Sequence, residues 1–406
     1  MKTDLDALMR ERNLDAIVVT GLVRGNPPLI YLLNGALISH AIWIKKRDAE
    51  PTLIVGSMER EEAQTAGVPL ILETRYNYSQ LLREHAGDAL AARVAFFGCI
   101  FEDLGVRGNV GFYGMEDQGA AYRLLRALDA ALPEVTVVGE FGRTVLDEAR
   151  ATKSAAEVAR IREAGRRTAG VVDATLAFLK QHAVAADETL RRADGAPLTV
   201  GEVHAFIRRQ IALQDLEDPE GFIFSTGRDA GIPHSKGTLT APMRLGESIV
   251  FDIFPREAGG GYFFDMTRTF CLGYAPPAVQ RLYDDTRACL ESVISQVEAG
   301  TEARRYQALT CACYRERGHL TIEEDPATLS GYVHTVGHGV GLDVHEEPFF
   351  REKTLLRPGH VFTAEPGLYY PDEGMGCRLE DVLWIDEAGA VHNLTDFPYD
   401  LVIPMG

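Results

Sequence analysis

The stretch VFDIFPREAGGGYFFDMTRTFCL, residues 250–272, decides the fold prediction. Its flanks, VFDIF and YFFDMTRTF, are rich in the aromatic and β-branched residues typical of strands, and EAGGG between them is a turn sequence. A turn centred between Ala258 and Gly259 places Asp252 opposite Asp265. Two carboxylates that face each other across a strand pair repel, so we expect a positively charged group between them.

A second hairpin repeats this arrangement. VFTAEPGLYY (361–370) and GCRLEDVLWI (376–385) flank a turn rich in Pro and Gly, which favour turns. The register places Glu365 opposite Glu380. Burying four carboxylates without partners is prohibitive. Two divalent cations would neutralise them, and a hydroxide bridging two metals about 4 Å apart is the chemistry that such a site supports.

The composition limits the possible partners. The chain has 406 residues, 46% of them hydrophobic, and a formal net charge of −18. The length predicts a globular protein with two domains, and so negative a surface argues against a nucleic acid or an anionic membrane as partner. The charged start and the lack of a long apolar run predict neither a signal peptide nor a transmembrane helix, so we expect a cytoplasmic protein. Six scattered cysteines without a CxxC spacing fit reduced thiols.

The hydrophobic pattern predicts two domains. Residues 1–148 alternate between strand and helix patterns, as in an α/β domain. From 149 to 406 the order helix, helix, hairpin occurs twice, which suggests two similar halves around a shared site. In this part, Thr199 and Glu202 form a capping-box pattern before a helix. The strands predicted in the first domain cover 15–19, 40–46, 52–56, 70–73, 94–98, 110–114 and 135–139.

Histidines gather in two loop-like segments. GFIFSTGRDAGIPHSKG (221–237) displays His234 in a loop bounded by Gly and Pro, and such loops often carry catalytic groups. GYVHTVGHGVGLDVHEEP (331–348) contains His334, His338 and His345. His334 and His338 have the spacing of a helical zinc pair, but the glycines and β-branched residues between them oppose a helix. We therefore predict an irregular, closely packed segment with a functional role.

Residues 150–406 resemble the pita-bread metallopeptidases, which include Xaa-Pro aminopeptidases, Xaa-Pro dipeptidases (prolidases) and methionine aminopeptidases. The preceding domain resembles the N-terminal domain of the creatinase and prolidase branch. The resemblance implies a creatinase-like α/β domain at 1–148 and an α+β pita-bread catalytic domain at 149–406. The two aspartates lie two residues further apart than is usual in the family, so the first turn is longer here. The matching positions are Asp252, Asp265 in DMTRT, His338 in VGHGVGLDVHE, Glu365 in AEPGLYYP and Glu380 in CRLED.

The resemblance also implies the metal ligands. Asp252 matches a ligand of one ion, His338 and Glu365 match ligands of the other, and Asp265 and Glu380 match bridging ligands. Four carboxylates and one imidazole suit Mn²⁺, with Co²⁺ or Zn²⁺ as alternatives.

Further residues match catalytic positions of the family. Glu365 is similar in position to the proton shuttle, and His345 to the histidine that stabilises the tetrahedral intermediate. His234 and His334 resemble histidines on the substrate side. Arg378 shares a strand face with Glu380, so we expect it to hold a ligand carboxylate, with a plain ion pair as the alternative.

The predicted function is hydrolysis of the bond before proline in dipeptides or short peptides, by a homodimeric Xaa-Pro dipeptidase or aminopeptidase. One alternative is a metal-dependent C–N hydrolase acting on a small non-peptide substrate, similar to creatinase or ectoine hydrolase. The other is a non-catalytic binding relative. Creatinases lack the metal ligands and binding relatives typically lose them, whereas this chain keeps all of them. The choice between dipeptidase and aminopeptidase, the residue preferred before proline and the physiological metal stay open.

Overall fold

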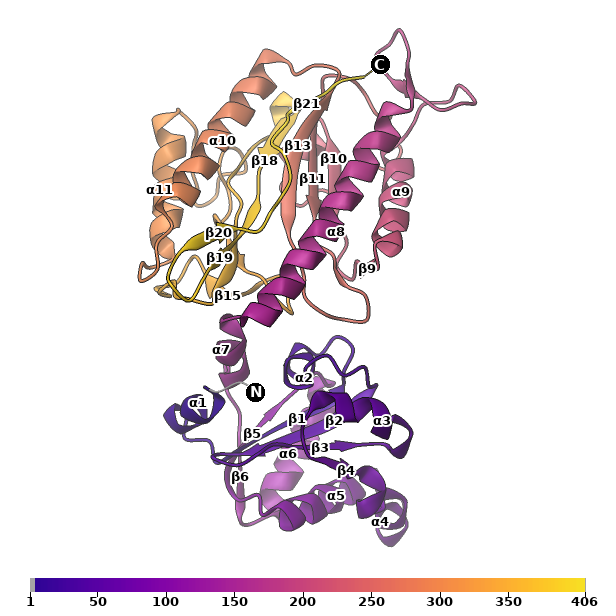
Figure 1. Cartoon of the computed structure of the whole chain (residues 1–406), viewed down its shortest axis with the longest axis vertical. Coiled ribbons are helices and arrows are strands. Elements are labelled where there is room, and N and C mark those ends of the chain that lie inside the picture. Colours follow the sequence, from indigo (N-terminus) through magenta and orange to yellow (C-terminus); the bar gives the residue numbers. More distant parts are fainter. Residues whose placement is uncertain (1–3, 406) are drawn as a thin grey trace. The chain divides into compact units, whose positions relative to one another are not determined.

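The computed structural model describes residues 4–405 and divides the chain into two compact units (Figure 1). Unit 1 comprises Met1–Arg150 with Gly259–Gly261, and unit 2 comprises Ala151–Ala258 with Tyr262–Gly406. Within the described residues, no helix is both long and apolar enough to cross a membrane.

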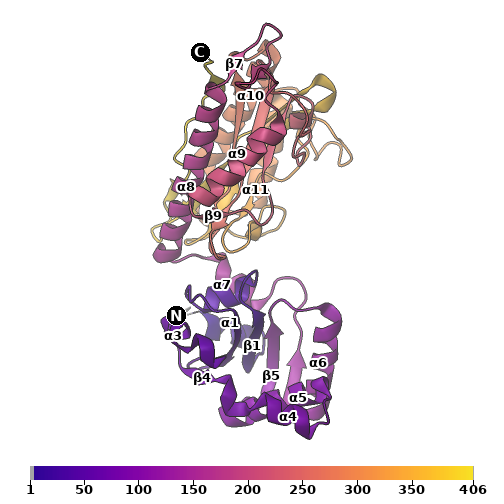
Figure 2. The same ribbon diagram turned by 90° about the vertical axis from the view of Figure 1, so that its right-hand side faces the viewer.

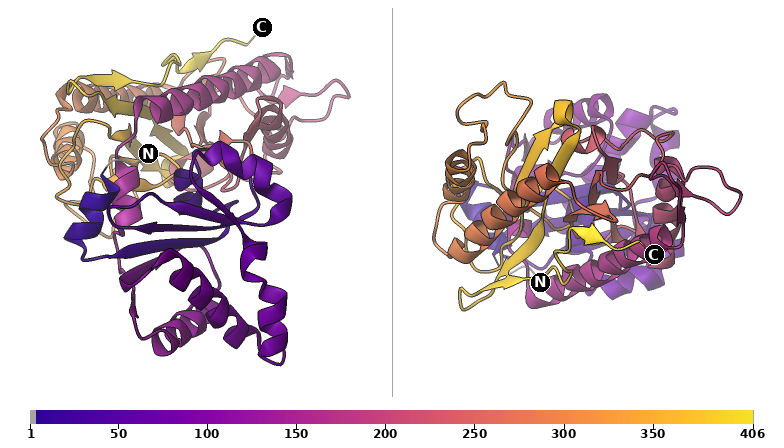
Figure 3. Two further views of the ribbon diagram at one scale, coloured as in Figure 1. Left: turned by 60° about the horizontal axis from the view of Figure 1, so that its bottom comes forward. Right: turned by 90° about the horizontal axis from the view of Figure 1, so that it is seen from above.

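Unit 1 is built on a mixed six-stranded sheet with the order β4-β3-β2-β1-β5-β6. Apolar side chains of α5 and α6 pack with those of the sheet in one core, and Figures 2 and 3 show these helices lying beside the strands. The strands are β1 (Ala16–Leu22), β2 (His40–Lys46), β3 (Thr52–Val55), β4 (Leu70–Leu72), β5 (Gly108–Tyr113) and β6 (Val135–Val138). The α-helices are α1 (Leu5–Glu11), α2 (Pro27–Leu32), α3 (Arg60–Ala63), α4 (Tyr78–Glu84), α5 (Ala89–Leu104), α6 (Gln118–Ala131) and α7 (Val145–Ala151), the last of which ends in unit 2.

One predicted strand of unit 1 is wrong, because residues 94–98 lie inside helix α5. The side chain of Asp88 accepts hydrogen bonds from two backbone N–H groups of the first turn, and Gly105 ends the helix in the left-handed conformation. A short apolar run fits a buried helix face as well as a strand, and here these end signals favour the helix. The other predicted strands of this unit are confirmed.

Unit 2 places four long helices in two pairs. α8 packs against α9 and α10 against α11, and Figure 1 shows the strands between the two pairs. The predicted capping box is confirmed, since the Thr199 side chain and Glu202 bond each other's backbone N–H groups at the start of α9. The helices are α8 (Ala155–Lys180), α9 (Val200–Leu213), α10 (Pro277–Gln296) and α11 (Arg304–Glu316).

The strands of unit 2 form two main sheets, ordered β10-β11-β13-β21 and β15-β14-β16-β19-β20, with β17-β18, β12-β9 and β7-β8 as separate pairs. The strands are β7 (Ala183–Val184), β8 (Leu190–Arg191), β9 (Leu216–Glu217), β10 (Ile223–Thr226), β11 (Ser248–Ile253), β12 (Arg256–Glu257), β13 (Met266–Leu272), β14 (His338–Gly339), β15 (Glu346–Phe349), β16 (Val361–Ala364), β17 (Gly367–Tyr370), β18 (Met375–Arg378), β19 (Asp381–Ile385), β20 (Val391–Asn393) and β21 (Val402–Ile403).

The predicted register of the first hairpin is wrong by two residues. β11 and β13 pair Asp252 with Thr267, so Asp265 lies just before β13. The connection is a long loop instead of a tight turn, because β12 within it pairs with β9 through Arg256 and Glu217. A shift of two preserves the face on which strand residues point, and Asp265 therefore still reaches the site.

The predicted register of the second hairpin is confirmed. β16 pairs with β19 and β17 with β18 in that register, and Ala364 lies opposite Asp381. Each long predicted strand is interrupted once. Glu365 and Glu380 occupy the two interruptions.

Candidate active site and metal centre

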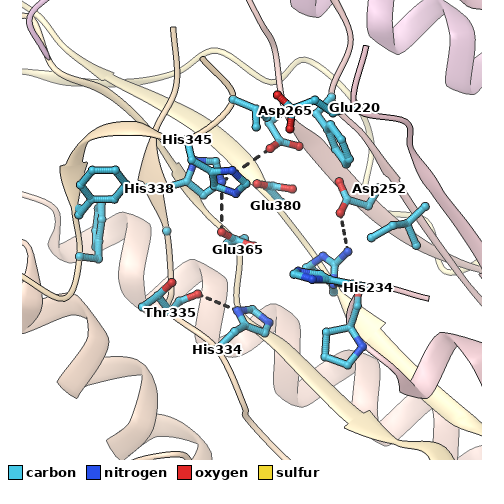
Figure 4. Close-up of a pocket in the computed structure, with 18 of the residues that line it drawn as sticks. Glu220, His234, Asp252, Asp265, His334, Thr335, His338, His345, Glu365 and Glu380 are labelled. Atoms are coloured by element: carbon cyan, nitrogen blue, oxygen red, sulfur yellow. Dashed lines mark hydrogen bonds and ion pairs between the residues drawn. The ribbon is translucent and has the colours of Figure 1, made fainter. Parts of the chain in front are cut away.

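The predicted site residues line one cavity of unit 2, with a volume of about 670 Å³. Figure 4 shows the carboxylates and histidines converging there from separate segments. The residues brought together are His234, Asp252, Asp265, His334, His338, His345, Glu365, Arg378 and Glu380.

The interrupted hairpin strands aim two carboxylates at the cavity. The backbone N–H of Glu365 donates to the Val336 carbonyl at 2.8 Å, and that of Glu380 donates to the Thr267 carbonyl at 3.0 Å. At these two positions the strands of the hairpin do not pair with each other, and the backbone of each bonds to a different segment. The side chains of Glu365 and Glu380 therefore lie at the centre of the site, next to the other labelled carboxylates and histidines (Figure 4).

Asp265, His338 and Glu380 each offer a ligand atom, and these atoms lie within 4.8 Å of one another. His338 Nε2 is 3.4 Å from Glu365 Oε1 and 3.7 Å from Asp265 Oδ2. Nδ1 of the same ring lies 3.1 Å from the Gly339 carbonyl oxygen. This contact assigns the proton to Nδ1 and leaves the Nε2 lone pair facing the carboxylates, as a metal ligand requires.

Burial and crowding shift the ionisation of this cluster. Burial raises the pKa of Asp265 and of Glu365 far above their usual values, and the nearby Glu380 raises both further. Burial and the charge of Asp252 raise the pKa of Glu380 to about 8. Burial lowers the pKa of His338 to about 3, so its imidazole is neutral. The cluster therefore favours a neutralising cation.

Three buried carboxylate oxygens, namely Asp252 Oδ1, Asp265 Oδ1 and Glu380 Oε1, accept no hydrogen bond from residues 4–405. Buried acceptors are normally satisfied, and leaving them unsatisfied costs free energy. A divalent ion would satisfy all three. Carboxylate oxygens with one neutral imidazole form a donor set for such ions, so the residues present fit divalent metal ions.

Arg378 joins the two hairpins through its buried guanidinium. Its partner is Asp252 at 2.5 Å, on β11, and not Glu380 on its own hairpin. It also donates to the Tyr369 hydroxyl at 2.6 Å and to the Pro233 carbonyl at 3.2 Å. The strand is interrupted between positions 378 and 380, so the two-residue periodicity that placed Arg378 beside Glu380 does not extend across this point.

Two neighbouring residues of β13 hold Glu380. Thr267 Oγ1 donates to Glu380 Oε2 at 2.8 Å. Arg268, only 1% exposed, donates to the Glu380 carbonyl and to Asp381 Oδ1, both at 2.9 Å. Arg268 lies inside the DMTRT motif, but no sequence pattern marked it as part of the site, because its partners follow more than 110 residues later.

The remaining histidines surround the cluster. His334 Nε2 lies 2.8 Å from the Tyr369 hydroxyl, and burial lowers the pKa of His334 to about 3. The ring of His345 lies 4.2 Å from that of His338, measured between centroids. His234 lies on the Asp252 side of the cavity (Figure 4).

Other lining residues have no signal in the sequence. Glu220, Lys236, Phe254 and Arg351 also face the cavity. Glu220, Lys236 and Arg351 come from irregular segments outside the two hairpins, and Phe254 directly follows β11 in the irregular part of the first hairpin. At these positions neither periodicity nor motif spacing marks a side chain as part of a site.

Comparison with known sequences identifies relatives that align with part of the chain. The probable dipeptidase PepE of Mycobacterium tuberculosis is 30% identical over 207 residues, 50% of this chain and 52% of that protein. The Xaa-Pro dipeptidase of Pyrococcus furiosus is 27% identical over 192 residues, 47% of this chain and 51% of that protein. The chain thus aligns with about half the length of these curated relatives.

Comparison with solved structures extends over both units. The X-Pro aminopeptidase of Thermotoga maritima superposes with a TM-score of 0.74 at 21% identity, covering 98% of this chain and 99% of that one. The chain therefore has a pita-bread fold preceded by an α/β domain. The model of metallopeptidase family M24 matches residues 159–387, more than half of the sequence. Together with the convergent carboxylates and His338, this match shows that the chain belongs to metallopeptidase family M24.

Proposed function

We propose that this protein hydrolyses the peptide bond before proline in dipeptides, using two divalent metal ions. The observation that carries the proposal is the cluster of four carboxylates, three of them buried, around the buried, neutral His338. Three of the carboxylate oxygens accept no hydrogen bond from residues 4–405. Asp252, Asp265, His338, Glu365 and Glu380 would hold the ions. When bound, the ions supply Lewis acidity that activates water and polarises the scissile carbonyl.

The protein side chains would orient the substrate and transfer protons. Glu365, whose pKa is raised by burial, would accept a proton from the attacking water and pass it to the leaving nitrogen. His345, exposed to the cavity beside His338, would donate to the oxygen that becomes negative. His334, oriented by Tyr369, and His234 would contact the substrate.

Two observations support dipeptides over longer peptides. The curated relatives described above are a probable dipeptidase and an Xaa-Pro dipeptidase. In addition, the cation Arg351 lines the cavity, where it could bind the carboxylate that follows proline in a dipeptide. The fold does not favour either class, because an X-Pro aminopeptidase shares it.

Mn²⁺ is the ion that we propose, because oxygen ligands dominate the donor set. We also propose a reducing, cytoplasmic setting, which the six free cysteines support. A homodimer is proposed from the family resemblance alone, and its test is the mass of the protein in solution.

The proposal is tested by incubating the Mn²⁺-loaded protein with Xaa-Pro dipeptides, Xaa-Pro-Xaa tripeptides and creatine. Cleavage of dipeptides alone supports the proposal. Cleavage of tripeptides alone would instead assign an aminopeptidase, and cleavage of creatine a non-peptide C–N hydrolase. A protein that binds metal but cleaves none of these substrates would contradict the assignment as an Xaa-Pro peptidase.

A further inference from the structure

A buried ion pair in unit 2, formed by Lys153 and Glu346, lies outside the lining of the candidate metal centre. Lys153 Nζ lies 2.5 Å from Glu346 Oε1, and the two side chains are 2% and 6% exposed. The two residues are 193 positions apart in the chain. A buried ion pair often adds little stability relative to apolar packing. The segments that Lys153 and Glu346 contact therefore indicate the role of the pair better than its contribution to stability does.

Glu346 closes the segment that carries His345, residues 340–345, which we name the His345 loop. Oε2 of Glu346 accepts hydrogen bonds from the backbone N–H of Leu342 at 3.1 Å and of Asp343 at 3.3 Å. A Cβ atom placed on Gly341 would lie 2.2 Å from Glu346 Oε1, so the carboxylate fills the space that a side chain would need there. The loop is thus folded around this one carboxylate.

The loop and Lys153 are both fixed to the segments that carry metal-ligand candidates. The backbone N–H of Phe263, two residues before Asp265, donates to the Gly341 carbonyl at 2.7 Å. The backbone N–H of Lys153 donates at 2.7 Å to the carbonyl of Gly359, which precedes β16 and Glu365. Lys153 Nζ also donates to the Ala151 carbonyl at 3.3 Å. The ammonium group is therefore held in one position.

We infer that Glu346, fixed in place by its ion pair with Lys153, is a positioning residue that holds His345 against the metal cluster. Glu346 directly follows His345 in the chain, and the His345 ring lies 4.2 Å from the ring of His338. Lys153 acts only through Glu346. This inference rests on the proposed function, in which His345 acts on the reacting carbonyl.

The first test is a double-mutant cycle. Glu346→Gln in the otherwise native protein is expected to lower kcat about 10- to 100-fold, as loss of a residue that orients a site residue typically does, with KM changed less than about threefold. In a His345→Ala background the same change should lower kcat less than about threefold, because there is no imidazole left to position. Equal losses in both backgrounds would indicate a merely structural role and overturn the inference.

Charge removal gives a second test. Lys153→Met combined with Glu346→Met removes both charges, so it should recover thermal stability relative to either single variant while kcat stays low. Recovery of native kcat would overturn the inference. The matched control is Glu140→Gln in unit 1, where Glu140 pairs with Arg12 at 2.6 Å and accepts from the Tyr113 hydroxyl at 2.6 Å. That control should lose stability and keep its kcat.

A third measurement needs no activity. Hydrogen exchange of the backbone amides of the His345 loop should be faster in Glu346→Gln than in the native protein, while the amides of α10 keep their protection. If the native protein cleaves no Xaa-Pro peptide, the proposed function fails, but this measurement still tests the contact between Glu346 and the loop. Unchanged exchange in the loop would overturn the inference.

Discussion

Replacing Arg378 by Met is expected to weaken both the stability of the metal-free protein and its affinity for metal. The guanidinium, 3% exposed, contacts Asp252 at 2.5 Å, the Thr267 hydroxyl at 3.2 Å and the Tyr369 hydroxyl at 2.6 Å. Met keeps most of the side-chain length but removes the charge and every donor. Asp252 then becomes a buried carboxylate that has lost its cation.

The contacts set the size of the effect. Removing one partner of a buried ion pair typically costs about 3–5 kcal/mol. In a unit of this size, each kcal/mol lowers Tm by about 2–4 °C, so we expect Tm to fall by about 6–20 °C. Loss of a residue that orients a metal ligand typically weakens metal binding about 10- to 100-fold.

Two measurements and one control decide this prediction. Calorimetry gives the Tm of the metal-free variant, and titration with Mn²⁺ gives its affinity. The matched control is Arg256→Met, because Arg256 is also buried and pairs with Glu217 at 2.7 Å in the same unit, away from the cavity. The control should lose Tm but bind Mn²⁺ normally. If Arg378→Met also bound Mn²⁺ with native affinity, Arg378 would not orient a metal ligand.

Three further predictions follow from the site. Glu365→Gln and His345→Ala should each lower kcat on an Xaa-Pro dipeptide by at least about 100-fold, and a near-native rate in either would remove that residue from the mechanism. Thr267→Val should weaken Mn²⁺ binding more than Thr267→Ser, because only Ser keeps a hydroxyl donor for Glu380; equal titration curves would contradict this. The metal-free protein should lose stability from pH 7 to pH 8, because folded Glu380 keeps its proton up to about pH 8 whereas the unfolded chain has already released it. The buried histidines, whose pKa values are lowered, make stability rise with pH, but only below about pH 6.5. A Tm of the metal-free protein that rises from pH 7 to pH 8 would refute this prediction.

Local patterns in the sequence were sufficient to predict much of unit 2. The Pro-Asp-Glu-Gly turn and the alternating strands around it predicted that Glu365 and Glu380 face each other, and the pairing on both sides of them has that register. The capping box at Thr199 predicted the start of α9. Turns, caps and two-residue periodicity depend on near neighbours in the chain, so these features could be predicted from a few residues at a time.

Only the tertiary structure decided which distant side chains meet. It paired Arg378 with Asp252, 126 residues away, and Glu346 with Lys153, 193 residues away. It also shifted the first hairpin by two residues, with β12 in the connection paired to the distant β9. The sequence by itself determined which residues carry carboxylate and imidazole groups suited to metal, and it determined the register of the second hairpin. Their partners depend on how segments that are far apart in the sequence pack around a buried charge. The free energy of that packing is shared among many contacts, and no local sequence pattern contains them.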